Sequence, residues 1–309
     1  AIPHIPVTAH GLKENGYATI ATTDWLPYSW SINNVAFAEV MHTALSYFQA
    51  GRAEAGYKLL KSSVLDGMYL GDSPGNFGQI SFYDAARGEC YRDFGDPIGV
   101  ASRVLIQGLF GILPDALNKQ IILRPGFPDD WDKASVSTPD ISYRFTRKED
   151  TDTYHITQRF QTPLHPVLQI NARKEKIRSV KVNGVPATWQ SIESAHGYPL
   201  LSIQAEGTSS TTITIEWEGA PLHTLAAQEV VIASNGKLAL QIPSGASISQ
   251  VYDPQSVLAK HTMGATAFNA QIKGEPGHHT FFVYTHQGEM DWWQPVNIYI
   301  ENTRKAPSY

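Results

Sequence analysis

The spacing of apolar residues changes near residue 125, and this change most constrains what the chain can fold into. Before it, apolar side chains recur every three or four residues over 33–49, 52–65 and 96–110, which predicts three amphipathic helices. After it, the helical period disappears, and short segments bounded by turn residues predict β-strands. The chain is therefore expected to be helical at its start and β-rich over the rest.

The predicted strands have the spacing of a β-sandwich, and a second β-rich stretch begins near residue 229. Asn183-Gly184 is a strong hairpin-turn signal. The expected strands are 141–146, 153–161, 167–171, 177–182, 200–204 and 211–217, followed by 230–233, 238–242, 248–252, 267–272, 280–284 and 296–300. We predict an α+β multidomain chain, with a helical region at 1–125, a β-sandwich at 126–222 and a second β-rich region at 223–309.

Composition excludes several classes of protein. The 309 residues carry a net charge of −5, and Lys and Arg dominate no stretch, which argues against nucleic acid as a partner. Only 17% of residues are charged, and a surface rich in neutral polar groups suits ligands such as sugars. The single cysteine, Cys90, excludes an internal disulfide framework, and no apolar run approaches the ~18 residues of a membrane span.

Several strings resemble the six-hairpin glycosidase superfamily, which includes rhamnosidase-like enzymes. Residues 24–34 read DWLPYSWSINN ahead of a helix, and residues 108–115 and 121–128 read GLFGILPD and IILRPGFP, with Trp131 following. The last strings are similar to the point where an (α/α)6 barrel ends and its trailing β-sandwich begins, and VKVNG at 180–184 resembles a strand and turn of that β-domain. The resemblance implies the C-terminal part of an (α/α) barrel followed by β-sandwich domains.

The helical region is too short for a complete barrel of that kind. Twelve helices need about 300 residues at ordinary helix and loop lengths, whereas about 125 residues precede the β-region. The sequence also begins at Ala1 without an initiator Met. We therefore expect a fragment whose partner is the missing N-terminal part of its own polypeptide.

Six carboxylates gather in the irregular segment 66–96, among several aromatic residues. Glycoside hydrolysis needs a carboxylic acid and a second carboxylate, and sugar clefts combine acids with aromatic rings. The resemblance implies that this segment lies at the mouth of the barrel. It makes Glu89 and Asp93 candidate catalytic residues, with Asp24 as the opposing acid. The expected substrate-binding residues are Trp25, Trp30, Asp72, Tyr83, Tyr91 and Arg92.

A structural role stays open for each of these side chains. Arg87 and Arg92 can pair with the acids in a structural ion-pair network, and Asp24 can cap a turn. The tryptophans can be buried. In the last β-rich region, Trp292-Trp293 forms a sugar-binding platform, or one tryptophan is buried and the other lies at a domain interface.

The sequence contains no metal-ligand signature and no phosphate-binding glycine loop, so no cofactor and no metal are expected. The favoured function is a secreted or periplasmic glycoside hydrolase, or a fragment of one, acting on a polysaccharide or oligosaccharide by an inverting mechanism. Two alternatives stay open, namely a polysaccharide lyase and a non-catalytic carbohydrate-binding module. The expected partner is a carbohydrate, with no nucleic acid and no membrane span.

Overall fold

The structure, a computed structural model, describes residues 20, 34–65, 82–84, 89–91, 96–223 and 229–302. Of Asn34 and of the two segments 82–84 and 89–91, it describes the backbone alone. By their internal contacts, the residues form two compact units. The first comprises 1–144, 158–167 and 206–209, and the second comprises 145–157, 168–205 and 210–309.

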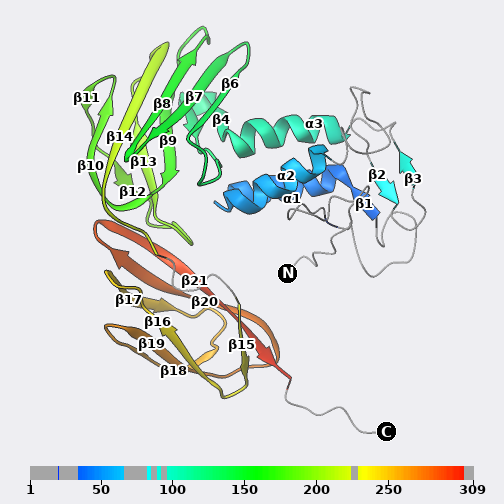
Figure 1. The fold of residues 1–309 in the computed structure, drawn as a ribbon, viewed down its shortest axis with the longest axis vertical. Coiled ribbons are helices and arrows are strands. Elements are labelled where there is room, and N and C mark those ends of the chain that lie inside the picture. Colours follow the sequence, from blue (N-terminus) through cyan, green and yellow to red (C-terminus); the bar gives the residue numbers. More distant parts are fainter. Residues whose placement is uncertain are drawn as a thin grey trace. The chain divides into compact units, whose positions relative to one another are not determined.

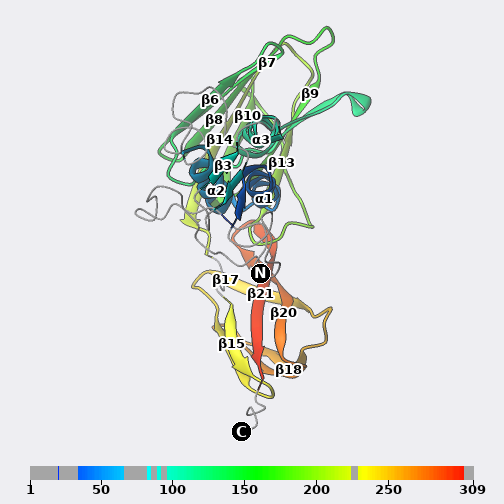
Figure 2. The same ribbon diagram turned by 90° about the vertical axis from the view of Figure 1, so that its right-hand side faces the viewer.

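The described residues of the helical region form a small helix cluster beside a three-stranded sheet (Figures 1 and 2). Helix α1 contacts both α2 and α3, and α3 continues into the π-helical turn η4. The sheet has the order β1-β2-β3. The bounds are α1 Phe37–Gln49, α2 Ala53–Val64, α3 Asp96–Arg103, η4 Val104–Leu109, β1 Asn34–Ala36, β2 Phe82–Asp84 and β3 Glu89–Tyr91.

Three glycines lie against the ring of Phe48 on α1. A Cβ atom added to Gly56, Gly108 or Gly126 would lie 3.0, 2.7 or 2.4 Å from the Phe48 ring. Each glycine therefore allows the backbone of its segment to approach the ring more closely than any other residue would. This packing joins α2, η4 and the segment after β5 to α1.

Two larger sheets follow, with strand orders β11-β10-β14-β8-β7-β6 and β12-β13-β9-β5-β4. Burial alternates along β8 and β14, so the first of these sheets has a core face and a more exposed face. The bounds are β4 Ile112–Asp115, β5 Gln120–Leu123, β6 Lys133–Ser137, β7 Ile141–Lys148, β8 Thr151–Gln158, β9 His165–Asn171, β10 Lys174–Val182, β11 Val185–Pro186, β12 Gln190–Ser191, β13 Leu200–Gln204 and β14 Ser210–Pro221, with a 3-10 turn at Ala116–Asn118 between β4 and β5.

The turn between β10 and β11 confirms the hairpin predicted at Asn183-Gly184. The φ angles of the two residues are +51° and +80°, and Val182 pairs with Val185 across them. Two consecutive residues with positive φ are typical of a type I′ turn, which Asn-Gly adopts readily.

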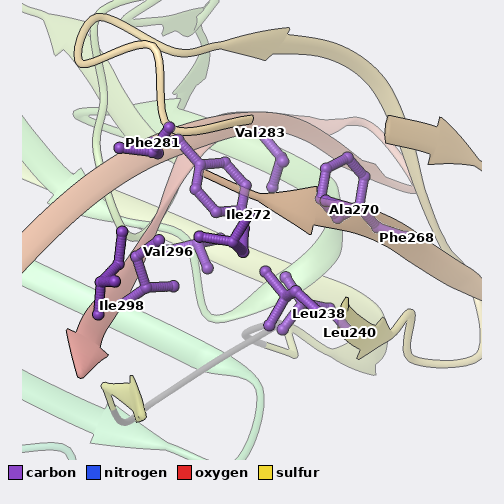
Figure 3. Packing of buried hydrophobic residues seen from close by; sticks show 11 residues of the cluster. Leu238, Leu240, Phe268, Ala270, Ile272, Phe281, Val283, Val296 and Ile298 are labelled. Atoms are coloured by element: carbon purple, nitrogen blue, oxygen red, sulfur yellow. The ribbon is translucent and has the colours of Figure 1, made fainter. Parts of the chain in front are cut away.

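The C-terminal β-region consists of a four-stranded sheet, β15-β21-β20-β17, and a three-stranded sheet, β16-β19-β18. Its core is made of side chains from β16 and β19 of one sheet and β20 and β21 of the other, and Figure 3 shows these side chains pointing toward one another. The bounds are β15 Val230–Ala233, β16 Lys237–Gln241, β17 Ala246–Tyr252, β18 Leu258–Met263, β19 Ala267–Ile272, β20 Gly277–Gln287 and β21 Met290–Glu301. The fully buried side chains include Phe268, Ile272, Phe281, Val283, Val296, Ile298 and Ile300.

The prediction of a partial (α/α) barrel, and with it the resemblance to the six-hairpin glycosidases, is wrong. The part of the chain that the structure describes is mostly β-strand and holds three α-helices. A barrel requires successive helical hairpins. Here 82–84 instead pairs as an antiparallel strand with both 34–36 and 89–91, and 112–123 forms the hairpin β4–β5. The α1–α2 hairpin buries its apolar face in the small cluster described above.

In the residues that the structure describes, no helix is both long enough and apolar enough to cross a membrane.

Candidate functional site

The outer face of the sheet β15-β21-β20-β17 carries an unusual set of aromatic side chains. Along β20 and β21, alternate residues are buried in the core, and those between them are only partly buried. The outward positions of an ordinary sheet are mostly polar. Here Phe282 and Tyr284 on β20 and Trp293 on β21 occupy them, beside Tyr252 on β17.

These four residues, Tyr252, Phe282, Tyr284 and Trp293, form what we call the aromatic platform. The ring of Tyr252 stacks on that of Phe282 with centroids 6.1 Å apart, and it meets the Trp293 ring edge-on at 6.4 Å. The Tyr284 and Trp293 rings lie 4.9 Å apart. Tyr252 is 58% exposed, so the platform presents ring surface to solvent.

The two adjacent tryptophans have different environments. Trp292 is 1% exposed, and its indole N–H donates to Gln294 Oε1 at 3.1 Å. Trp293 is the outward residue. Its main chain pairs with the loop before β13, because Trp293 N donates to Ala195 O at 2.9 Å and Gly197 N donates to Trp293 O at 2.8 Å. One tryptophan is therefore buried, as one of the two interpretations expected, and the other belongs to the platform.

A chain of polar side chains borders the platform. Ser249 Oγ on β17 lies 2.6 Å from Nε2 of His286 on β20, and His286 Nδ1 is hydrogen-bonded to Asp291 Oδ1 on β21. The ring of His286 meets that of Tyr284 edge-on at 5.0 Å. All three polar residues are accessible to solvent, since the side chains of His286 and Asp291 are 34% and 41% exposed and Ser249 is exposed.

Burial and the negative charges of Asp291 and Glu193 raise the pKa of Tyr284. A raised pKa keeps the phenol protonated at neutral pH. The platform therefore offers a hydroxyl donor from Tyr284 beside the carboxylate acceptor of Asp291.

The structure does not locate most of the side chains that the sequence predicted to be catalytic or substrate-binding. Asp24, Trp25, Trp30, Asp72, Arg92 and Asp93 lie outside the described residues.

Three further predicted residues are located by their backbone alone. The strand register places Glu89 opposite Asp84, Tyr91 opposite Phe82, and Tyr83 opposite Cys90. Their roles stay predictions.

The sequence reasoning missed Ser249, Tyr252, Phe282, Tyr284 and His286. The available signal was the alternation in FFVYTHQ at 281–287, where aromatic residues stand at every second position. Such a pattern places rings on the polar face of a strand. Among the residues that the structure describes, no three His, Cys, Asp or Glu side chains converge to hold a metal ion.

No family model and no characterised protein matches the sequence. Among solved structures, the tandem Ig repeats of Dlar are 11% identical, with 49% of this chain and 90% of that chain covered and a TM-score of 0.17. The N-terminal periplasmic domain of ScsB from Proteus mirabilis is 7% identical, with 55% and 99% covered and a TM-score of 0.18. The N-terminal Ig1-2 module of the Drosophila receptor protein tyrosine phosphatase DLAR is 10% identical, with 50% and 91% covered and a TM-score of 0.19. With TM-scores this low, the fold is defined by the strands and sheets described above.

Proposed function

We propose that the C-terminal β-region binds carbohydrate through the aromatic platform. The single observation that supports this is the group of four rings on a sheet face where polar side chains are usual, with Tyr252 exposed and the other three rings partly buried. Tryptophan and tyrosine rings stack on the apolar C–H face of a sugar, and their polar atoms reach its hydroxyl groups.

The polar side chains beside the platform suit the rim of a sugar ring. Asp291 supplies an acceptor and Tyr284 a donor, and Ser249 Oγ, which bonds His286, can accept a further hydrogen bond. Because hydroxyl groups both donate and accept, this mixture matches a neutral sugar better than a phosphate. The carboxylates of Asp291 and Glu193 near Tyr284 would repel an anionic ligand.

The polysaccharide lyase alternative has less support. Its substrate would be a uronate, which requires cationic groups at the site. The charged groups that act on the pKa of Tyr284 are the carboxylates of Asp291 and Glu193. A glycan-binding role also fits a secreted or periplasmic location, which fractionation of the producing cell would test.

Truncating the platform is expected to weaken glycan binding. A glycan array with the full chain identifies a ligand, and calorimetric titration then measures its affinity for the variants. Trp293→Ala and Tyr252→Ala should each raise the Kd about tenfold or more, equivalent to about 1.4 kcal/mol, because each removes a ring face against which the sugar packs.

Val231→Ala is the matched control. Val231 is 59% exposed, close to the 58% of Tyr252, and it lies on β15 at the edge of the same sheet. Its Kd should equal that of the unmodified chain. Equal affinity in all three variants, with unchanged thermal transitions, would reject the platform as the binding surface.

A further inference from the structure

We propose that Ser249, His286 and Asp291 form a nucleophile–base–acid arrangement that hydrolyses carboxylic esters. The three residues lie on the neighbouring strands β17, β20 and β21. Ser249 Oγ is 2.6 Å from His286 Nε2, within the range for a nucleophile and its general base, and His286 Nδ1 is bonded to Asp291. A nucleophile, a base and a group that orients the base are recognised by such geometry rather than by order in the sequence.

The hydrogen-bond donors and acceptors define where the protons lie. An ionised carboxylate only accepts, so the proton between Asp291 and His286 belongs to Nδ1. In the neutral imidazole, Nε2 then carries a lone pair, and Ser249 must donate its Oγ proton to it. This is the tautomer in which histidine can remove the serine proton.

A β-bulge places Ser249 beside His286. Ile248 pairs with Thr285 and Gln250 pairs with Tyr284, so Ser249 is the extra residue between them. Because paired residues share a face, Gln250 lies on the outer face with Tyr284, and the bulge adds Ser249 to that same face. Bulges often re-aim a side chain next to an active site.

The reaction needs no co-reactant other than water. Ser249 Oγ attacks the ester carbonyl carbon while its proton moves to His286 Nε2, and the carbonyl oxygen becomes an oxyanion. The oxyanion then re-forms the carbonyl group, the bond to the alcohol oxygen breaks, and the alcohol takes the proton from Nε2. Water, deprotonated by Nε2, attacks the acyl carbon. The second oxyanion then re-forms the carbonyl group, the bond to Ser249 Oγ breaks, and Nε2 returns its proton to Oγ, which releases the carboxylic acid and free Ser249.

The carboxylate of Asp291 assists this chemistry. Asp291 stabilises the imidazolium formed in each step, and its pairing holds the ring in the required orientation.

The class of substrate follows from the platform and rests on the function proposed above. Tyr284 meets His286 edge-on, so an alcohol part stacked on Tyr284 and Trp293 lies next to the reacting serine. We assign O-acylated sugars as the natural substrates, cleaved to the sugar hydroxyl and a carboxylate.

The test uses the full chain with a fluorophosphonate probe and with p-nitrophenyl acetate. We expect the probe to add to Ser249, as located by peptide mass spectrometry, and the chain to release p-nitrophenol. Ser249→Ala should abolish labelling and hydrolysis. Asp291→Asn should lower the rate about 100-fold or more, because it removes the acceptor that holds the Nδ1–H tautomer.

Ser247→Ala is the matched control, since Ser247 is an exposed serine on the same strand and pairs with His286 in the sheet register. It should be labelled and active like the unmodified chain. Labelling that persists in Ser249→Ala, or no labelling of any serine, would overturn the proposal. Because p-nitrophenyl acetate contains no sugar, this result is independent of glycan binding, whose failure would remove only the assignment of the alcohol part.

Discussion

Replacing Asp152 with alanine is expected to lower the free energy of unfolding by about 3–5 kcal/mol. Asp152 is 1% exposed, and its Oδ1 accepts hydrogen bonds from Arg147 Nε and Arg173 Nη1, both at 2.9 Å. Its Oδ2 accepts from the indole N–H of Trp217 at 3.0 Å. The substitution leaves three donors without their acceptor, and Trp217, which is 1% exposed, cannot turn its N–H toward water.

Equilibrium unfolding in urea, followed by the near-UV signal of the tryptophans, measures this loss. Asp150→Ala is the control, because Asp150 carries the same charge two residues away but its side chain is 55% exposed and pairs with Lys174. Solvent screens that pair, so its removal should leave the unfolding midpoint unchanged. Equal destabilisation by both substitutions would show that the buried hydrogen bonds of Asp152 are not its source.

Most strands could be predicted because apolar and polar residues alternate along a strand that buries one face. The expected strands 200–204, 230–233 and 267–272 match β13, β15 and β19 to the residue. Strand β18 was missed, because five of its six residues are exposed and its sequence has no apolar alternation. Strand partners were also not predictable, since alternation defines a face and not a neighbour.

The barrel was predicted from short sequence segments whose residues are explained by local packing in this fold. In GLFGILPD, Gly108 allows η4 to approach the ring of Phe48. Gly111 adopts the positive φ angle that the turn into β4 needs. An amphipathic helical hairpin likewise occurs in many folds, because its pattern shows only that one face is buried.

The candidate site was partly visible in the sequence. The adjacent tryptophans at 292–293 indicated the correct strand, because the outward position of Trp293 follows from simple alternation. Ser249 and His286 are 37 residues apart, and a bulge brings them together, so no local spacing indicates their contact.

Replacing Gly111 with alanine is expected to destabilise the fold by more than about 3 kcal/mol. Gly111 has a φ of +64°, a region that costs an L-residue roughly 1–2 kcal/mol. A Cβ atom there would lie 1.9 Å from Arg124 O and 2.1 Å from Arg124 C. The same two residues are joined by a hydrogen bond from Arg124 N to Gly111 O at 2.9 Å, so the backbone cannot separate without breaking the start of the β4–β5 hairpin.

Gly99→Ala gives the opposite expectation within the same unit. Gly99 lies in α3, is exposed, and a Cβ atom there would have nothing within 4 Å. Alanine should therefore stabilise the chain by about 0.5–1 kcal/mol through its better helix propensity. Thermal unfolding of both variants checks the pair, with a falling Tm for Gly111→Ala and a constant or rising Tm for Gly99→Ala. A Gly111→Ala variant as stable as the unmodified chain would mean that the turn between η4 and β4 does not need the left-handed backbone, because only then could a Cβ atom avoid the Arg124 carbonyl.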